Sequence, residues 1–207
     1  MSFDFFISAL VTLLVIVDPL GIVPIFIGMT KGLPAAARRQ VALRASLIAF
    51  AILCGAAMIG SWLLQQLGIG LPAFRIAGGL LLFSIASEMV FGVRIVRKSH
   101  EAEAVIDDQV RNIAAFPLAI PLMAGPGAIT AAILLAGRAG NDLVQLGALL
   151  AAIAIVVVSC LIAFMLGARL AKLLGVTGSI VLERLLGVML AALAVQFVID
   201  GVRAAWA

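Results

Sequence analysis

The sequence predicts an all-α membrane protein in which six transmembrane helices form two inverted three-helix repeats. Three observations lead to this fold class: an extreme apolar composition, six long apolar segments, and a series of residues that recurs in the second half. Of the 207 residues, 65% are hydrophobic, and the mean hydropathy is +1.28. A soluble domain is about 45–50% apolar. Lipid must therefore be the solvent for most of this chain, which excludes a water-soluble enzyme.

The six apolar segments are each long enough to cross a hydrocarbon core about 30 Å thick, which takes about 20 helical residues. The runs are continuously apolar instead of alternating, so they predict helices and not the strands of a membrane barrel. No basic residue precedes the first segment, and we expect it to be a retained span instead of a signal peptide. The expected spans are Phe3–Met29, Val41–Leu64, Leu71–Phe91, Ile113–Ala136, Leu143–Leu166 and Ile180–Ile199.

The basic residues between the spans predict the orientation in the membrane. One side holds only Arg75, Arg138 and Arg203. By the positive-inside rule, the side that is richer in basic residues faces the cytoplasm. We therefore predict a multi-pass protein of the bacterial inner membrane with both termini outside. The richer side holds eleven basic residues: Lys31, Arg38, Arg39, Arg44, Arg94, Arg97, Lys98, Arg111, Arg169, Lys172 and Arg184.

An internal repeat relates the two halves of the chain. Residues 1–94 and 113–207 form the two repeats, and residues 95–112 form a cytoplasmic linker. Because each half has three spans, the second half must enter the membrane from the opposite side, as in many secondary transporters. The alternative is a duplicated structural bundle without a transport function. At one constant offset, the residues that recur are Pro19, Lys31, Gly60, Leu63, Leu67, Gly68 and Ile69, matched by Pro126, Arg138, Gly167, Leu170, Leu174, Gly175 and Val176. After a two-residue insertion in the second half, the series continues with Arg75, Gly78, Gly92, Val93 and Arg94, matched by Arg184, Gly187, Gly201, Val202 and Arg203.

The first and fourth spans are predicted to be interrupted at mid-membrane. Proline and glycine cluster in the middle of each, and proline removes a backbone donor and breaks the helix. Unwound backbone is tolerated in a membrane where it lines a cavity, and paired interrupted spans mark transporter binding sites. The alternative is a pair of proline kinks used for packing. The predicted substrate-binding residues are Asp18, Pro19, Gly21, Pro24, Gly125, Pro126, Gly127 and Thr130.

Each residue type in these breaks suits a separate task. Pro19 and Pro126 suit the first position of a new half-helix, with Asp18 and Gly125 as caps, and the free amides that follow could hold a substrate carboxylate. Thr130 could add a hydroxyl group. Asp18 is the only acid deep within a span, so it is a candidate for binding a proton, a coupling cation or a substrate amine. A purely capping role for Asp18 is the equal alternative.

The remaining polar residues predict no further chemistry. Cys54 and Cys160 lie in apolar runs without metal-ligand spacing, and His100 lies in a charged connection. Gln196 is the polar residue of the last span, and helix packing is its favoured role. We therefore expect no metal, no cofactor and no nucleic-acid partner.

Two segments resemble the signature regions of the MarC family. They are Asp18-Pro19-Leu20-Gly21 with Pro24, and the run from Ile120 to Thr130, of which Gly-Pro-Gly-Ala-Ile is the most specific part. The likeness covers essentially the whole chain. It implies a layout similar to exporters of the LysE type, and a function like that of the members that resemble neutral amino-acid transporters. Many members have Asn where this chain has Asp18.

The sequence thus predicts a secondary transporter, and not an enzyme, that moves small neutral amino acids or similar zwitterions. Coupling to protons or sodium ions would use Asp18. The competing hypotheses are an exporter of another small metabolite, a passive channel, and a membrane assembly subunit without active transport. An intramembrane enzyme is disfavoured because the spans contain no nucleophile–base pair.

Overall fold

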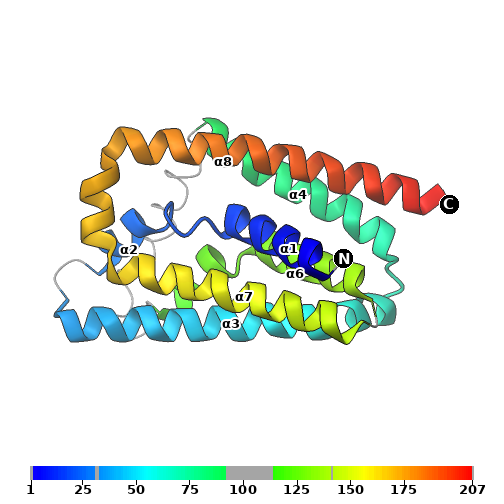
Figure 1. Ribbon diagram of the computed structural model, residues 1–207, viewed down its shortest axis with the longest axis horizontal. Helices are drawn as coiled ribbons and strands as arrows, with labels where there is room; N and C mark the ends of the chain where they lie inside the picture. The colour runs from blue at the N-terminus through cyan, green and yellow to red at the C-terminus, as the bar shows by residue number, and fades with distance from the viewer. Residues whose placement is uncertain (1, 31–32, 92–113, 141, 207) are drawn as a thin grey trace.

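The computed structural model describes residues 2–30, 33–91, 114–140 and 142–206, and every regular element in these ranges is a helix (Figure 1). The prediction of an all-α protein is confirmed for this part of the chain. Four elements are single helices and four belong to the two interrupted segments. They are α1 (Ser2–Val17), α2 (Val23–Met29), α3 (Ala35–Gln66), α4 (Leu71–Phe91), the π-helix η1 (Ala114–Met123), α6 (Pro126–Ala139), α7 (Leu143–Met165) and α8 (Gly167–Trp206).

Four of these helices are long and apolar enough to cross a membrane. They are α3, α4, α7 and the Ile180–Trp206 part of α8, whereas α1 and α6 are shorter apolar helices. The two predicted spans that were expected to be broken are each divided between two elements, α1 with α2 and η1 with α6. The chain is therefore a multi-pass membrane protein, and the inverted repeat of six spans remains a prediction. The predicted linker, residues 95–112, lies outside the described residues.

The closest helix pairings join the first half of the sequence to the second. Helix α4 runs alongside α8 (Figure 1), α1 packs on α7, and α3 packs on α6. Glycines allow the backbones of α4 and α8 to approach: a Cβ on Gly79 would lie 2.7 Å from the carbonyl oxygen of Ala194, and one on Gly201 would lie 3.0 Å from that of Pro72. Helices in lipid associate without a hydrophobic driving force, and small residues stabilise such contacts by allowing close packing.

Helix α8 begins earlier than the predicted last span, which starts at Ile180. The connection before the last span is helical from Gly167, one residue after the turn that ends α7. In Figure 1 the first part of α8 crosses the end of the bundle, and the longer part then returns beside α4. The start of α8 packs on α2, because a Cβ on Gly167 would lie 3.3 Å from the Val23 side chain.

The buried core joins the shorter broken helices to the long ones. Leu13 of α1, Leu53 of α3, Leu134 of α6 and Ile153 of α7 are all at most 1% exposed. The ring of Phe26 in α2 stacks on a ring of α7, with the two centroids 4.4 Å apart. One face of the interrupted helices therefore packs into the core formed with the long helices.

Candidate functional site

The first interruption separates α1 from α2 by a single irregular turn. The amide of Asp18 completes the last hydrogen bond of α1, to the carbonyl of Leu14 at 2.9 Å, and Asp18 then adopts a positive φ of 53°. Residues 19–22 form the turn, and regular helix resumes at Val23, with Pro24 as its second residue. The second half-helix thus begins four residues later than expected, because hydrogen bonds within the turn, such as Ile22 N–H to Asp18 C=O at 3.3 Å, precede the regular ladder.

The carboxyl group of Asp18 is buried and only half satisfied. The residue is 2% exposed, and its Oδ1 accepts a hydrogen bond of 3.0 Å from the amide of Gly21. Its Oδ2 is buried and has no hydrogen-bond partner among the described residues. A side chain on Gly21 would collide with this oxygen, so glycine is required for the carboxyl group to fold over the turn. An unsatisfied buried acceptor is unfavourable by about 1–3 kcal/mol, which calls for an explanation beyond capping.

A cavity of about 440 Å³ lies beside this turn, between α1, α7 and α8. Its size is that of a small-molecule site. Its walls are apolar except for Asp18 and Ser159, and the Ser159 hydroxyl donates to the carbonyl of Val156 at 2.6 Å. The cavity thus suits an aliphatic group, with one carboxyl group and one hydroxyl at its edge. Its lining residues are Leu14, Val15, Asp18, Pro19, Leu20, Ser159, Ile162, Ala163, Leu166, Leu182 and Leu186.

The second interruption is abrupt. The π-helix η1 ends at Met123, with the wide hydrogen bond from Ala124 N–H to Ala119 C=O at 2.8 Å. Gly125 then takes extended backbone angles as the N-cap of α6, and Pro126 is the first residue of that helix. The predicted capping role of Gly125 and the predicted place of Pro126 are confirmed. The amides of residues 127 and 128 have no acceptor within α6, because the first turn of any helix leaves its donors free.

The two interruptions lie next to each other in space. A Cβ on Gly127 would lie 3.5 Å from the side chain of Ile16, two residues before Asp18. The same position is covered from α4, with Ile85 Cδ1 at 2.8 Å and Leu82 Cδ2 at 3.1 Å. The free amides at the start of α6 are therefore shielded by apolar side chains in this structure.

The predicted site residues fall into two groups. Asp18 and Pro19 line the cavity, with Gly21 beneath the carboxyl group and Pro24 in the first turn of α2. Thr130 is buried against α4, where its methyl group meets Gly78. The described lining of the cavity includes none of the predicted residues of the second interruption, namely Gly125, Pro126, Gly127 and Thr130.

Sequence reasoning missed the contribution of α7 and α8 to the cavity. Ser159 carries no mark in the sequence, because a serine in an apolar helix commonly bonds to its own preceding turn. Leu182 and Leu186 are four residues apart and so share a face of α8. This spacing is common to most apolar helices and does not identify a cavity by itself.

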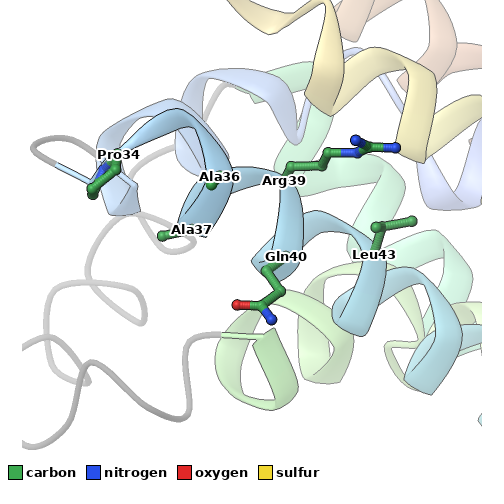
Figure 2. Close-up of a pocket in the computed structure, with 6 residues that line it drawn as sticks. All are labelled: Pro34, Ala36, Ala37, Arg39, Gln40 and Leu43. Atoms are coloured by element: carbon green, nitrogen blue, oxygen red, sulfur yellow. The ribbon is translucent and has the colours of Figure 1, made fainter.

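A second, open pocket of about 550 Å³ lies at the start of α3. Figure 2 shows Arg39 and Gln40 extending from α3 in different directions. A cation and an amide among small apolar groups are typical of a membrane–water interface. No group of three His, Cys, Asp or Glu side chains that could hold a metal ion is found among the residues that the structure describes. The pocket is lined by Pro34, Ala36, Ala37, Arg39, Gln40 and Leu43.

Comparison with known proteins identifies relatives along the whole chain. The family model described as MarC family integral membrane protein matches residues 3–206. A UPF0056 membrane protein from Methanocaldococcus jannaschii is 38% identical over 211 residues, which cover 99% of each chain. One from Archaeoglobus fulgidus is 39% identical over 200 residues, or 96% of this chain and 92% of the relative. The UPF0056 membrane protein YhcE of Escherichia coli is 36% identical over 201 residues, or 97% and 91%. No solved structure matches the chain.

Proposed function

This chain belongs to the MarC family of integral membrane proteins, as its signature segments predicted, and we propose that it is a secondary transporter of small neutral amino acids or similar zwitterions. The observation that carries the proposal is the meeting of two interrupted helices beside a buried acid. Ile16 before the first break contacts the Gly127 position after the second, and Asp18, two residues after Ile16, lines the cavity. Paired broken helices of this kind form the sites of many transporters.

The chemistry of the two breaks complements the two ends of a zwitterion. The free Oδ2 of Asp18 can accept a hydrogen bond from an amine or hold a coupling cation. The unpaired amides at the start of α6 can hold a carboxylate. The cavity of about 440 Å³ can receive the aliphatic part of the same molecule.

Movement of α6 against α4 would open this site. The amides of α6 lie behind Leu82 and Ile85, and the Asp18 oxygen lies over Gly21. A ligand can reach both only after these contacts separate, so the structure corresponds to a closed state in the proposed cycle. The pairing of α1 with α7 and of α3 with α6 supports a rocking motion, since each pair joins the two halves of the sequence.

Flux measurements in proteoliposomes test the proposal. Uptake and counterflow are measured with a panel of labelled neutral amino acids, in vesicles with and without the purified protein. We expect saturable uptake of small members and acceleration by unlabelled substrate on the opposite side. Unsaturable leakage of many solutes without counterflow would instead indicate a channel. No flux above that of empty vesicles would contradict transport of this substrate class.

A further inference from the structure

The carboxylate of Asp200 is bound through both of its oxygens at the junction of α6 with α8. Arg138, in the last turn of α6, approaches Oδ2 to 2.9 Å. Gln196, one turn before Asp200 on α8, donates its side-chain amide to Oδ1 at 2.7 Å. The guanidinium carbon of Arg138 also lies 5.1 Å from the centre of the Phe197 ring, which supports the cation by a cation–π contact.

A second arginine, Arg75 of α4, is on the helix face that meets α6. One turn before it, Leu71 fills the space beside Gly137, with its Cδ2 2.8 Å from a Cβ placed there. Three residues after it, Gly78 packs against Thr130 and a leucine of α6. Residues spaced by three and four positions share a helix face, so Arg75 lies on the same face beside the end of α6.

The same arginine is also close in sequence to the contact between α4 and α8. Its neighbour Ile76 meets Gly201, the residue after Asp200, with its Cγ1 2.7 Å from a Cβ placed there. The Nε of Arg75 is buried and has no hydrogen-bond partner among the described residues. An unpaired guanidinium nitrogen therefore lies on the helix that packs against Gly201, the neighbour of Asp200 in the chain.

We propose that Arg138, Gln196 and Arg75 form a binding site for small carboxylates, in which Asp200 of the chain itself occupies the place of the ligand. A guanidinium group and a side-chain amide supply the N–H donors that a carboxylate requires, and guanidinium matches its planar shape. Arg138 contacts the Asp200 carboxylate directly, and Arg75 would add a second positive charge to the site. We call this group of donors the Asp200 site.

Exchange of Asp200 for a free carboxylate is feasible because the ion pair is only partly buried. The side chains of Arg138 and Asp200 are 32% and 26% exposed. An ion pair at this exposure contributes only about 0–1 kcal/mol, so a carboxylate from solution meets a weak competitor.

The repeat in the sequence supports a functional reading of the site. Arg138 and Arg75 correspond to Lys31 and Arg184, so a second pair of basic residues occupies the matching positions of the sequence. The offset that relates Arg75 to Arg184 carries Asp200 to Phe91, so the second pair has no acid at the matching position. A role for the Asp200 site as the first docking point of a substrate carboxylate rests on the proposed transport function.

Thiol modification at the ligand position tests the site without any measurement of transport. In purified protein that carries Cys54→Ala and Cys160→Ala, we would introduce Asp200→Cys and compare its reaction rates with a sulfonate-bearing and a trimethylammonium-bearing methanethiosulfonate. Val202→Cys is the control, because Val202 is 39% exposed on the same helix outside the donor set. We expect the rate ratio, anionic over cationic reagent, to be about tenfold higher for Asp200→Cys.

Three further arms separate the donors from the general charge of the surface. Arg138→Gln and Arg75→Gln should each lower the ratio toward that of the control. Sodium acetate should slow the anionic reagent at this position, relative to sodium chloride of the same ionic strength. An equal ratio for Asp200→Cys and Val202→Cys, or a ratio that is insensitive to Arg138→Gln, would overturn the site. A ratio insensitive only to Arg75→Gln would overturn the part assigned to Arg75.

The outcome is independent of the proposed function. The reagents report on charge at one position in detergent solution, whereas transport is decided by flux in vesicles. Normal flux together with no anion preference would contradict the Asp200 site and support the proposed transport function. An anion preference that acetate suppresses, together with no flux, would support the carboxylate site and contradict the proposed transport function.

Discussion

The two interrupted helices solve the same problem in different ways. The first break uses an irregular turn of residues 19–22, a positive φ at Asp18 and a glycine beneath its carboxyl group. The second break uses a cap at Gly125 and a proline at the start of the new helix, with ordinary backbone angles. The first break thus introduces a buried acid, and it depends on both Asp18 and Gly21. The second introduces only free amides, and its main requirement is a residue without a side chain at position 127.

Opposite orientation of the two breaks is tested by an all-or-none labelling experiment. Single cysteines would replace Ala36 at the start of α3 and Leu143 at the start of α7, which lie toward opposite ends of the long axis (Figure 1). We expect an impermeant maleimide to label Ala36→Cys only from the cytoplasmic side and Leu143→Cys only from outside. Both positions are exposed, so access does not limit the reaction. Labelling of both from one side would refute the inverted repeat.

Gly127→Leu should have the largest effect on transport. Its Cβ would already lie 2.8 Å from Ile85, and the remainder of a leucine would cover the amides at the start of α6. We expect loss of flux in proteoliposomes with normal insertion into the membrane. Gly147→Leu on α7 is the matched control, because nothing lies within 4 Å of a Cβ at that position. Normal flux by Gly127→Leu would place substrate binding elsewhere.

Gly21→Ala should destabilise the first break in a way that depends on Asp18. The added methyl group meets the Asp18 carboxyl group, so the hydrogen bond from the Gly21 amide is lost, with a destabilisation of about 1–3 kcal/mol. Thermal unfolding in detergent measures the effect. In an Asp18→Ala background the same substitution should be much less harmful, because the collision is absent. Gly28→Ala is the control, with open space at its Cβ. Equal losses in both backgrounds would remove the link between the two residues.

Asp18→Asn separates capping from coupling at the first break. Asparagine keeps an oxygen for the Gly21 amide and is an equally good cap, so folding should be retained. If Asp18 couples transport to protons, accumulation driven by a pH gradient should be lost while substrate affinity is kept. If it pairs with a substrate amine, affinity itself should fall. Substrate affinity and gradient-driven uptake are measured for the variant and for the parent protein. Unchanged values for both would leave Asp18 with a capping role alone.

Ser159→Ala should have the smallest effect of the series. Its hydroxyl bonds to the carbonyl of Val156 in its own helix, so alanine leaves no buried group unpaired. We expect normal unfolding temperature and an increase in apparent KM of a few fold if the hydroxyl contacts a ligand in the cavity. Flux at varied substrate concentration measures this. A loss of stability would show that Ser159 supports the helix and not the ligand.

Much of the architecture follows from the sequence alone, because hydropathy and proline act locally. A long apolar run must become a helix in lipid, whatever its neighbours, and this holds for α3, α4, α7 and the later part of α8. The break at Gly125-Pro126 was predictable to the residue, because both act through their own backbone. The positive φ of Asp18 and the late start of α2 were not, since they depend on hydrogen bonds of the turn.

The tertiary structure decided which residues meet. Sequence patterns place Asp18 in one break and Gly127 in another, but only packing brings α1 beside α6 and covers the amides with side chains of α4. The cavity wall formed by Ser159, Leu182 and Leu186, and the convergence of Arg138 on Asp200, join residues far apart in the chain. Local composition determined that this chain enters a membrane and where its helices break. Contacts between helices decided what lies around each break, because in lipid those contacts depend on shape and polar pairing and not on hydropathy.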